Sequence, residues 1–322
     1  MLEKNNLIPY LNYFYKANQN KMNTTFLTTF WKRNQPNFQM DIATWADELA
    51  FLYKSGISLE AALNYLHLHK PSIEEFEKWI QENALVISNG SEILVDTLTL
   101  EDLEFWNQNG YIVLKNAISK SDCEQTRTAI WNFLDKSPDD VASWYTQHPE
   151  QKGLMVNFSN HPTLNKNRMA SKIKKAFEQL YQTDTIYKTI DKISFNPPVS
   201  DNYSFMGSGL HWDVSLKLPI PFRLQGLIYL SDCGANDGAF HCVPGFHNHI
   251  ENWMKSLPKN SNPREVALQT LKPIPITGEA GDMVIWHQAL PHCATPNQGK
   301  MPRMVQYLSY FPEEYTEAEE WI

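Results

Sequence analysis

Cysteine is scarce in this chain of 322 residues, with only four, at positions 123, 233, 242 and 293. No two of them form a CxxC pair, which argues against a zinc knuckle or a thioredoxin-type motif. The N-terminal segment has no apolar core followed by a small-residue cleavage site, so no secretory signal peptide is recognisable. We therefore expect reduced, buried thiols and a cytoplasmic protein.

Positive charge is also in short supply, because 28 Lys and Arg face 36 Asp and Glu, giving a net charge of −8. A nucleic-acid-binding protein normally carries a basic patch or stripe. The longest basic cluster, Lys172, Lys174 and Lys175, is typical of a solvated helix face instead. No run of 18 or more apolar residues suggests a transmembrane helix. We expect neither a nucleic acid nor a membrane as partner.

Aromatic residues, in contrast, are abundant at 12%, and hydrophobic residues make up 42% of the chain, enough for a substantial core. Residues 1–95 read as a helical extension, a lid, a cap or a dimerisation element that makes a homodimer possible. Helices are predicted over Thr44–Lys54, with Gly56 as a stop, and over Ser58–Lys70 and Ser72–Asn83. Ser72 and Glu75 fit a capping box.

The next stretch combines helices with one strand. Ser121 and Glu124 fit a second capping box. The predicted elements are a helix over Thr99–Asn109 ended by Gly110, a strand over Tyr111–Leu114, a helix over Ser121–Lys136, a loop over 137–162 and a helix over 163–183.

After Ile186 the pattern changes to short runs divided by Pro, Gly and Asn, which favours an antiparallel barrel or sandwich. One helix, over residues 247–257, interrupts the strands. The predicted strands are Lys192–Asn196, Leu210–Leu218, Arg223–Ser231, Ala239–Val243, Asp282–His287 and Met304–Phe311.

The most informative motif is His211-Trp-Asp213. Alternate side chains of a strand point the same way, so His211 and Asp213 are predicted to project together into the barrel, with Trp212 on the other face. A histidine and a carboxylate in this arrangement are two-thirds of a 2-His-1-carboxylate triad for Fe(II). Alone, this pair also fits a purely structural role.

A second segment strengthens the metal interpretation by supplying a distal histidine, and an arginine eleven positions after His292. A planar guanidinium beside a metal suits bidentate capture of a carboxylate, which points to Arg303. His287, five positions before His292, competes with it for the distal position. His241, His247 and His249 form an alternative cluster in the sequence.

The C-terminal half resembles the phytanoyl-CoA dioxygenase family of Fe(II)/2-oxoglutarate-dependent oxygenases. The resemblance covers roughly residues 100–312 and is most specific over 209–311, while the N-terminal 95 residues lie outside it. The residues that carry it are His211, Asp213, Asp237, Gly238, Pro244, Gly245, His247, Gly281, Asp282, Pro291, His292, Asn297 and Arg303.

The resemblance implies an α+β protein with a mainly β core. This core would be a double-stranded β-helix, the cupin-like jelly roll of two facing antiparallel sheets, flanked by helices and preceded by the helical extension. Residues 96–322 would form the dioxygenase domain. The cofactors implied are Fe(II), 2-oxoglutarate as co-substrate, and O2.

The resemblance also implies residue roles. His211, Asp213 and His292 would be the iron ligands, and Arg303 would hold the distal carboxylate of 2-oxoglutarate. Family members often carry a small hydroxyl residue two positions after the distal ligand, where this chain has an alanine followed by Thr295. Thr295 and Gln225 are the further co-substrate contacts that we expect. Because related halogenases replace the ligand carboxylate with a small residue, a carboxylate here favours hydroxylation.

We therefore expect a hydroxylase that acts on an unactivated C–H bond of a small organic substrate of amino-acid, acyl or natural-product type and converts 2-oxoglutarate to succinate. Two alternatives remain open at this point. One is a non-catalytic jelly-roll protein that binds a metal or ligand. The other is a cupin-like metalloenzyme that does not use 2-oxoglutarate, a case that Arg303 argues against.

Overall fold

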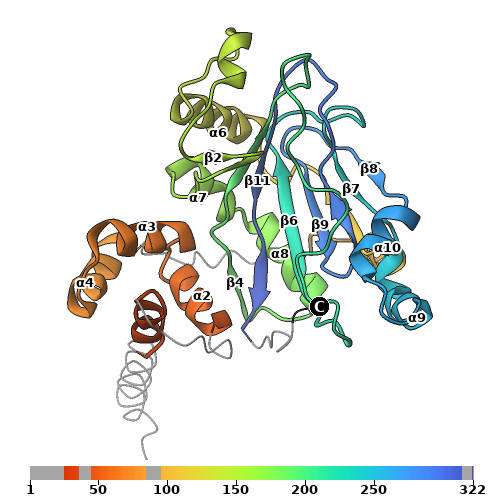
Figure 1. Cartoon of the computed structure of the whole chain (residues 1–322), viewed down its shortest axis with the longest axis horizontal. Helices are drawn as coiled ribbons and strands as arrows, with labels where there is room; N and C mark the ends of the chain where they lie inside the picture. Colours follow the sequence, from red (N-terminus) through yellow and green to blue (C-terminus); the bar gives the residue numbers. More distant parts are fainter. Residues whose placement is uncertain (1–24, 36–44, 85–95, 314–320, 322) are drawn as a thin grey trace, which may run out of the picture. The chain divides into compact units, whose positions relative to one another are not determined.

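The computed structural model describes residues 25–35, 45–84, 96–313 and 321, and divides the chain into two compact units, Met1–Ser88 and Asn89–Ile322 (Figure 1). Among the described helices, none is long and apolar enough to cross a membrane. All four cysteines are buried and unpaired with one another, as the sequence predicts.

The first unit consists of helices around an aromatic core, and the three helices predicted there are confirmed. A helix over residues 25–33 precedes α2 (Trp45–Lys54), α3 (Leu59–His69) and α4 (Ile73–Asn83). The capping box of Ser72 and Glu75 is present, because each side chain accepts a backbone N–H of the other. Phe30, Leu52 and Phe76 are fully buried in this core.

The second unit is built on a seven-stranded sheet in which every neighbouring pair is antiparallel. Its order is β1 (Tyr111–Leu114), β9 (Met283–His287), β6 (Leu224–Tyr229), β11 (Arg303–Tyr307), β5 (Ile193–Asn196), β3 (Met155–Val156) and β2 (Gln151–Lys152). A second sheet contains β10 (His292–Cys293), β7 (Phe240–Cys242) and β8 (Ile274–Ile276), and a two-stranded one contains β12 (Tyr310–Pro312) and β4 (Ile186–Lys188).

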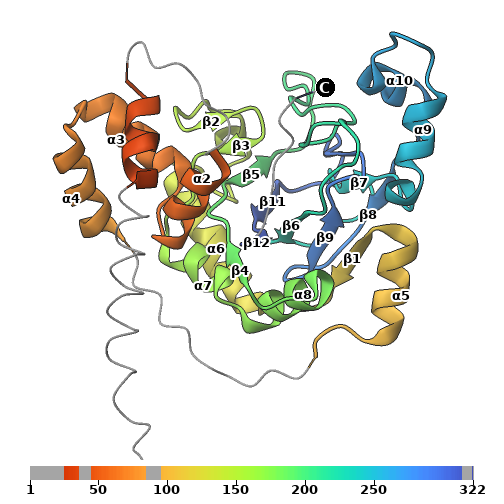
Figure 2. The same cartoon turned by 90° about the horizontal axis from the view of Figure 1, so that it is seen from below.

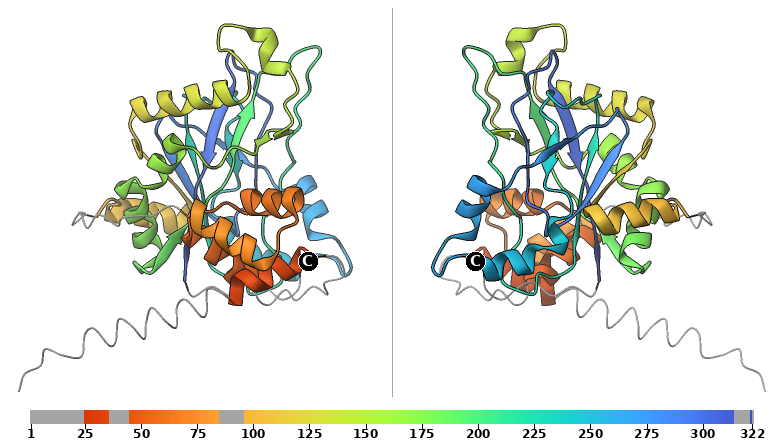
Figure 3. Two further views of the ribbon diagram at one scale, coloured as in Figure 1. Left: turned by 90° about the vertical axis from the view of Figure 1, so that its left-hand side faces the viewer. Right: turned by 90° about the vertical axis from the view of Figure 1, so that its right-hand side faces the viewer.

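Alternation along the central strand β6 places its side chains in two separate cores. Leu224 and Ile228 pack in the cluster shared with the helices, whereas Leu227 and Tyr229 pack in the cluster shared with β7. Figure 2 shows α6, α7 and α8 along one face of the large sheet, and β7 and β8 beyond the other. The side views in Figure 3 show the same strands flanked by these yellow and green helices. The architecture is the double-stranded β-helix expected for this chain.

The helices of the second unit follow the prediction in part. They are α5 (Leu100–Asn109), α6 (Lys120–Phe133), α7 (Pro162–Arg168), α8 (Ser171–Tyr181), α9 (Ile250–Ser256) and α10 (Pro263–Thr270), with short 3-10 turns η2 (Val141–Tyr145) and η3 (Phe246–Asn248).

The single helix predicted over 163–183 is wrong, because the chain forms α7 and α8 with a break between them. The Tyr310 hydroxyl donates to the carbonyl of Arg168 at 2.8 Å, and the buried Arg168 guanidinium donates to the carbonyls of Ser159 and Asp191. These tertiary bonds fix the end of α7. The loop predicted over 137–162 contains η2, β2 and β3, and α10 was not predicted at all.

The strand predicted over Leu210–Leu218 is also wrong. Only His211 forms a β-bridge, to His292, and the following residues make no ladder. The carbonyls of Trp212 and Val214, which a neighbouring strand would otherwise pair with, accept hydrogen bonds from the Arg264 side chain at 2.9 and 2.8 Å. The Arg264 side chain therefore supplies the hydrogen-bond donors that a neighbouring strand would supply to this segment.

The second predicted capping box lies two positions too late in the sequence. Helix α6 is capped by Ser119, whose hydroxyl oxygen accepts the N–H of Asp122 at 3.1 Å. Ser121 instead accepts a bond from Gln125 on the exposed helix surface. The S-x-x-D pattern of Ser119 and Asp122 thus caps the helix in place of the S-x-x-E pattern.

We expect Ser119→Ala to lower the free energy of unfolding by about 1 kcal/mol, because the first turn of α6 loses its side-chain acceptor. The matched variant Ser121→Ala should change it by less than about 0.5 kcal/mol, since this serine lies on an exposed helix surface. Urea unfolding of both variants checks the assignment. A larger loss for Ser121→Ala would move the cap back to the predicted position.

Candidate active site

Three of the predicted site residues meet at one point of the second unit. The ligand atoms of His211, Asp213 and His292 all lie within 4.8 Å of one another. The two histidines are brought together by their backbones, because each N–H donates to the other's carbonyl oxygen, at 3.0 and 2.9 Å. Asp213 follows two residues after this bridge. It comes from a bend, not from the predicted strand.

Both imidazoles turn the same nitrogen toward the centre of the cluster. Nδ1 of His211 lies 2.7 Å from the carbonyl oxygen of Gly209, and Nδ1 of His292 lies 3.1 Å from that of Leu290. A carbonyl can only accept, so these contacts assign the proton of each neutral ring to Nδ1. The Nε2 lone pairs of both rings are then available to a metal.

The carboxylate of Asp213 faces both of these nitrogens. One oxygen lies 3.2 Å from Nε2 of His292, and the other lies 3.5 Å from Nε2 of His211. Burial alone would raise the pKa of Asp213, but the facing His292 ring and the hydrogen bond from Gln225 outweigh this and lower it. Burial and the neighbouring His292 lower the pKa of His211. An ionised carboxylate beside neutral imidazoles is the ligand state that a divalent metal requires.

Gln225 on β6 fixes the orientation of this carboxylate. Its side-chain amide donates to Asp213 at 2.8 Å, and its carbonyl oxygen accepts the indole N–H of Trp286 at 3.1 Å. The amide is therefore used at both ends. Such a partner behind a metal ligand typically fixes the ligand's orientation and raises metal affinity.

The turn that leads into His292 is held by buried side chains. Its Ala289 carbonyl accepts the indole N–H of Trp212 at 2.9 Å, and its Ala289 N–H donates to Nδ1 of His287 at 2.9 Å. Burial lowers the pKa of His287 to about 3, which keeps this acceptor nitrogen unprotonated. His287 thus lies outside the three-residue cluster.

The alternative histidine cluster does not form. Nδ1 of His241 lies 2.9 Å from the carbonyl of Ala239, and the His247 ring packs 5.3 Å from that of His287. Within the described parts of the chain, only His211, Asp213 and His292 make up a group of three potential metal ligands.

Arg303 begins β11 and points into the same space between the two sheets. It is 2% exposed and lies over the Tyr229 ring, 5.9 Å from its centroid. Its Nη1 reaches Ser194 at a long 3.4 Å, and its Nε finds no hydrogen-bond partner in the described structure. A buried guanidinium normally has its donors matched by a carboxylate. Here that acceptor is missing from the described side chains, which fits a ligand carboxylate.

Thr295 contacts Asn196, which lies opposite Arg303 on the neighbouring strand β5. Its carbonyl oxygen accepts the side-chain amide of Asn196 at 3.1 Å, and Asn196 is the cross-strand partner of Arg303. The Thr295 hydroxyl contacts the carbonyl of Ala239 at 3.4 Å.

Sequence reasoning missed Arg264, which reaches the backbone on both sides of Asp213 from α10. A signal was present, because Asn262 caps this helix and Pro263 occupies its first turn. An Asn-Pro pair of this kind indicates a helix start.

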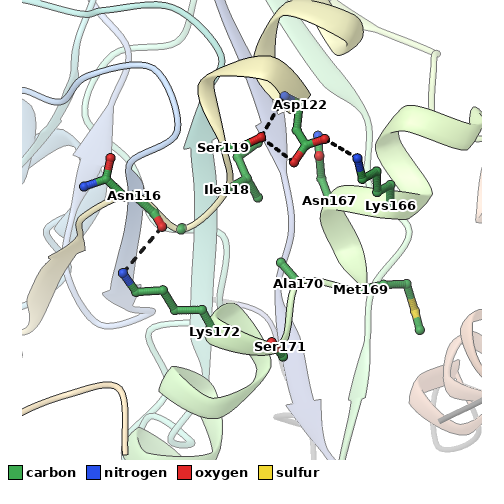
Figure 4. Close-up of a pocket in the computed structure, with 11 residues that line it drawn as sticks. Asn116, Ile118, Ser119, Asp122, Lys166, Asn167, Met169, Ala170, Ser171 and Lys172 are labelled. Atoms are coloured by element: carbon green, nitrogen blue, oxygen red, sulfur yellow. Dashed lines mark hydrogen bonds and ion pairs between the residues drawn. The ribbon is translucent and has the colours of Figure 1, made fainter. Parts of the chain in front are cut away.

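A separate cavity of about 700 Å³ lies on the helix-covered side of the large sheet, between the start of α6, the end of α7 and the start of α8 (Figure 4). Its charged side chains have partners, since Lys166 pairs with Asp122 and Lys172 donates to the carbonyl of Lys115. It contains none of the predicted site residues.

Comparison with known proteins identifies relatives of the second unit. The profile of the family described as phytanoyl-CoA dioxygenase matches residues 106–305. A putative phytanoyl-CoA dioxygenase of Dictyostelium discoideum is 24% identical, over 65% of this chain and 74% of its own. A methylphosphonate hydroxylase of Gimesia maris is 25% identical, over 66% of this chain and 81% of its own. The crystal structure of AviO1 from Streptomyces viridochromogenes superposes with a TM-score of 0.50 at 17% identity, covering 70% of this chain and all of that one.

We expect Gln225→Leu to weaken the binding of Co²⁺ about tenfold, because Asp213 loses the amide that orients it. Isothermal titration with Co²⁺ measures this effect. The matched control is Gln179→Leu, which removes a glutamine that caps the amides of Thr97 and Leu98 instead. If Gln225→Leu left Co²⁺ affinity unchanged and weakened only 2-oxoglutarate, its role would be confined to the co-substrate.

Proposed function

Because this chain belongs to the phytanoyl-CoA dioxygenase family, a family of iron- and 2-oxoglutarate-dependent oxygenases, we propose that it hydroxylates an unactivated C–H bond of a small organic molecule. The observation that carries the proposal is the pairing of a three-residue ligand cluster with a buried arginine whose Nε has no hydrogen-bond partner in the described structure. Both face the space between the two sheets.

His211, Asp213 and His292 would hold the iron. Two neutral imidazoles and one carboxylate are the ligand set typical of non-haem Fe(II) oxygenases, and they leave coordination positions open. The Nδ1 contacts with backbone carbonyls orient both rings before any metal arrives, and Gln225 orients Asp213. When bound with 2-oxoglutarate and O2, the iron supplies the oxidising chemistry, with release of succinate and carbon dioxide.

Arg303 would bind the distal carboxylate of 2-oxoglutarate. Its burial and its unmatched Nε support this role, because a carboxylate would satisfy the fork with two parallel bonds. We propose Thr295 and Gln225 as further co-substrate contacts. The position of Thr295 beside the cross-strand partner of Arg303 supports the first assignment. Gln225 lies directly beside the ligand Asp213, where the amide hydrogen that Asp213 does not accept would serve the co-substrate.

Two features of the site favour hydroxylation. Asp213 would occupy the coordination position that a halide takes in related halogenases, so a halide could not bind there. The rings of Trp286 and Phe240 pack 5.2 and 5.6 Å from that of His292, which shields one side of the site from water. Exclusion of water protects a reactive oxidant from side reactions.

The substrate is proposed to be a small molecule of amino-acid, acyl or natural-product type. The relatives named for phytanoyl-CoA and for methylphosphonate differ greatly in substrate size, so likeness alone leaves the class wide. Residues 1–95 are proposed to act as a lid, a cap or a dimerisation element of the 96–322 dioxygenase domain, and as a dimerisation element they would form a homodimer. A cytoplasmic location is supported by the four unpaired thiols.

The experiment that tests the function follows succinate release with Fe(II), 2-oxoglutarate and ¹⁸O₂ across a panel of amino acids, acyl derivatives and natural-product scaffolds. A substrate should stimulate succinate release, with one labelled oxygen in succinate and one in the hydroxylated product. Metal-dependent turnover without 2-oxoglutarate would favour the cupin-like alternative. Metal binding without turnover on any substrate would favour the non-catalytic one.

We expect Arg303→Met to weaken 2-oxoglutarate binding by about two orders of magnitude, because the distal carboxylate loses its buried, charged partner. Binding of 2-oxobutanoate, which has no distal carboxylate, should change little. Anaerobic titration of the Fe(II)-loaded protein with both acids measures the difference. Equal losses for the two acids would show that Arg303 does not recognise this carboxylate.

We expect Asp213→Ala to abolish succinate formation and to weaken Co²⁺ binding by more than about a hundredfold, since even partners behind the ligands are worth 10- to 100-fold. The near-ultraviolet circular dichroism spectrum should stay that of the wild type, because this side chain is half exposed. Full activity of the variant would contradict the ligand assignment.

A further inference from the structure

The backbone of Asp213 is not paired with any described strand. His211 is fixed by its two backbone bonds to His292, but the next residues form no ladder with any described strand. A metal ligand on an unpaired bend would have to be ordered when the metal binds, and that ordering lowers affinity. Some other contact must fix the backbone at this position.

That contact is made by Arg264. Its Nη1 donates to the carbonyl of Trp212 at 2.9 Å, and its Nη2 donates to the carbonyl of Val214 at 2.8 Å. The two carbonyls are the ones immediately before and after Asp213. The planar fork of one guanidinium thus holds both ends of this residue's backbone.

The helix that carries Arg264 is itself anchored. Asn262 caps α10 through the N–H of Arg264 at 3.0 Å, and Ala267 of the same helix is fully buried in the core between the sheets. The half-buried guanidinium also interacts electrostatically with Asp213, whose charge opposes the lowering of the Arg264 pKa by burial. Arg264 is therefore a fixed side chain on a packed element.

We propose that Arg264 is a positioning residue of the metal site, which presets the backbone of Asp213 so that its carboxylate faces His211 and His292. The role rests on the proposed function, because it presumes that these three residues bind a metal. It makes α10 part of the catalytic framework. Arg264 acts through the main chain, so it needs no contact with the metal or the substrate.

The test uses Co²⁺ as the probe and the full-length chain. Arg264→Met keeps much of the apolar stem but removes both donors, while Arg264→Lys keeps the charge without the fork. The matched control is Arg127→Met, because Arg127 also donates to a backbone carbonyl, that of Leu230, whose side chain packs in the core shared with the helices. Readouts are the Kd for Co²⁺ and the hydrogen exchange of the amides of residues 212–214.

We expect Arg264→Met to raise the Kd for Co²⁺ about tenfold or more and to speed exchange at these amides, with Arg264→Lys in between. Arg127→Met should leave both readouts unchanged. Arg264→Lys, which retains a donor and the charge, tests the role even if Arg264→Met does not fold, since a wild-type Kd in it would overturn the proposal.

A folded Arg264→Met with a Kd within about twofold of the wild type would likewise overturn the positioning role, because even a weak partner behind the ligands exceeds that. An equal loss of Co²⁺ affinity in Arg127→Met would also overturn it, because the effect would then come from a general loss of stability. Failure of the wild-type protein to bind Co²⁺, or tight binding by Asp213→Ala, would instead overturn the proposed function itself and with it this role.

Discussion

The site depends on a pair of backbone hydrogen bonds between His211 and His292. Two residues 81 positions apart in the sequence exchange both N–H···O bonds, so the spacing of their rings is set by main-chain geometry. Side-chain bonds then refine it, because each Nδ1 contacts a carbonyl two residues before its own ring. With both rings fixed, the position of Asp213 becomes the remaining variable, and both Gln225 and Arg264 restrict it.

The large sheet separates packing from chemistry by simple alternation. Along β11, Arg303 and Val305 face the space between the sheets, while Met304 and Gln306 face the helices. Gln306 is bonded there to Asn167 of α7, in a buried polar contact remote from the metal ligands. A change on the helix-covered face can therefore alter stability without touching a ligand, which lets the cavity beside α6 vary independently of the site.

Sequence patterns predicted the parts of this protein that depend on local rules. The capping box at Ser72 and the stop at Gly110 come from short-range chemistry, and both are present. His211 and Asp213 were identified by residue type and spacing, and His292 through the resemblance to a family, and the three side chains do converge. The strand predicted at Leu210–Leu218 is wrong because the Arg264 side chain of α10, and not a neighbouring strand, donates to the backbone carbonyls there. A contact between segments this far apart in the sequence does not change the hydrophobic pattern of either segment. The division of 163–183 into α7 and α8 likewise depends on Tyr310, more than a hundred residues away.

The unmatched Nε of Arg303 has a consequence for the lifetime of the protein. A buried guanidinium that lacks a facing carboxylate lowers the stability of the unliganded fold, and a bound carboxylate would remove that deficit. Any ligand selective for the folded state adds to stability by mass action, about 2.7 kcal/mol at a concentration of one hundred times its Kd. A co-substrate drawn from central metabolism would then also act as a folding ligand. In a cell short of it, the enzyme would be not only idle but also more readily unfolded and degraded.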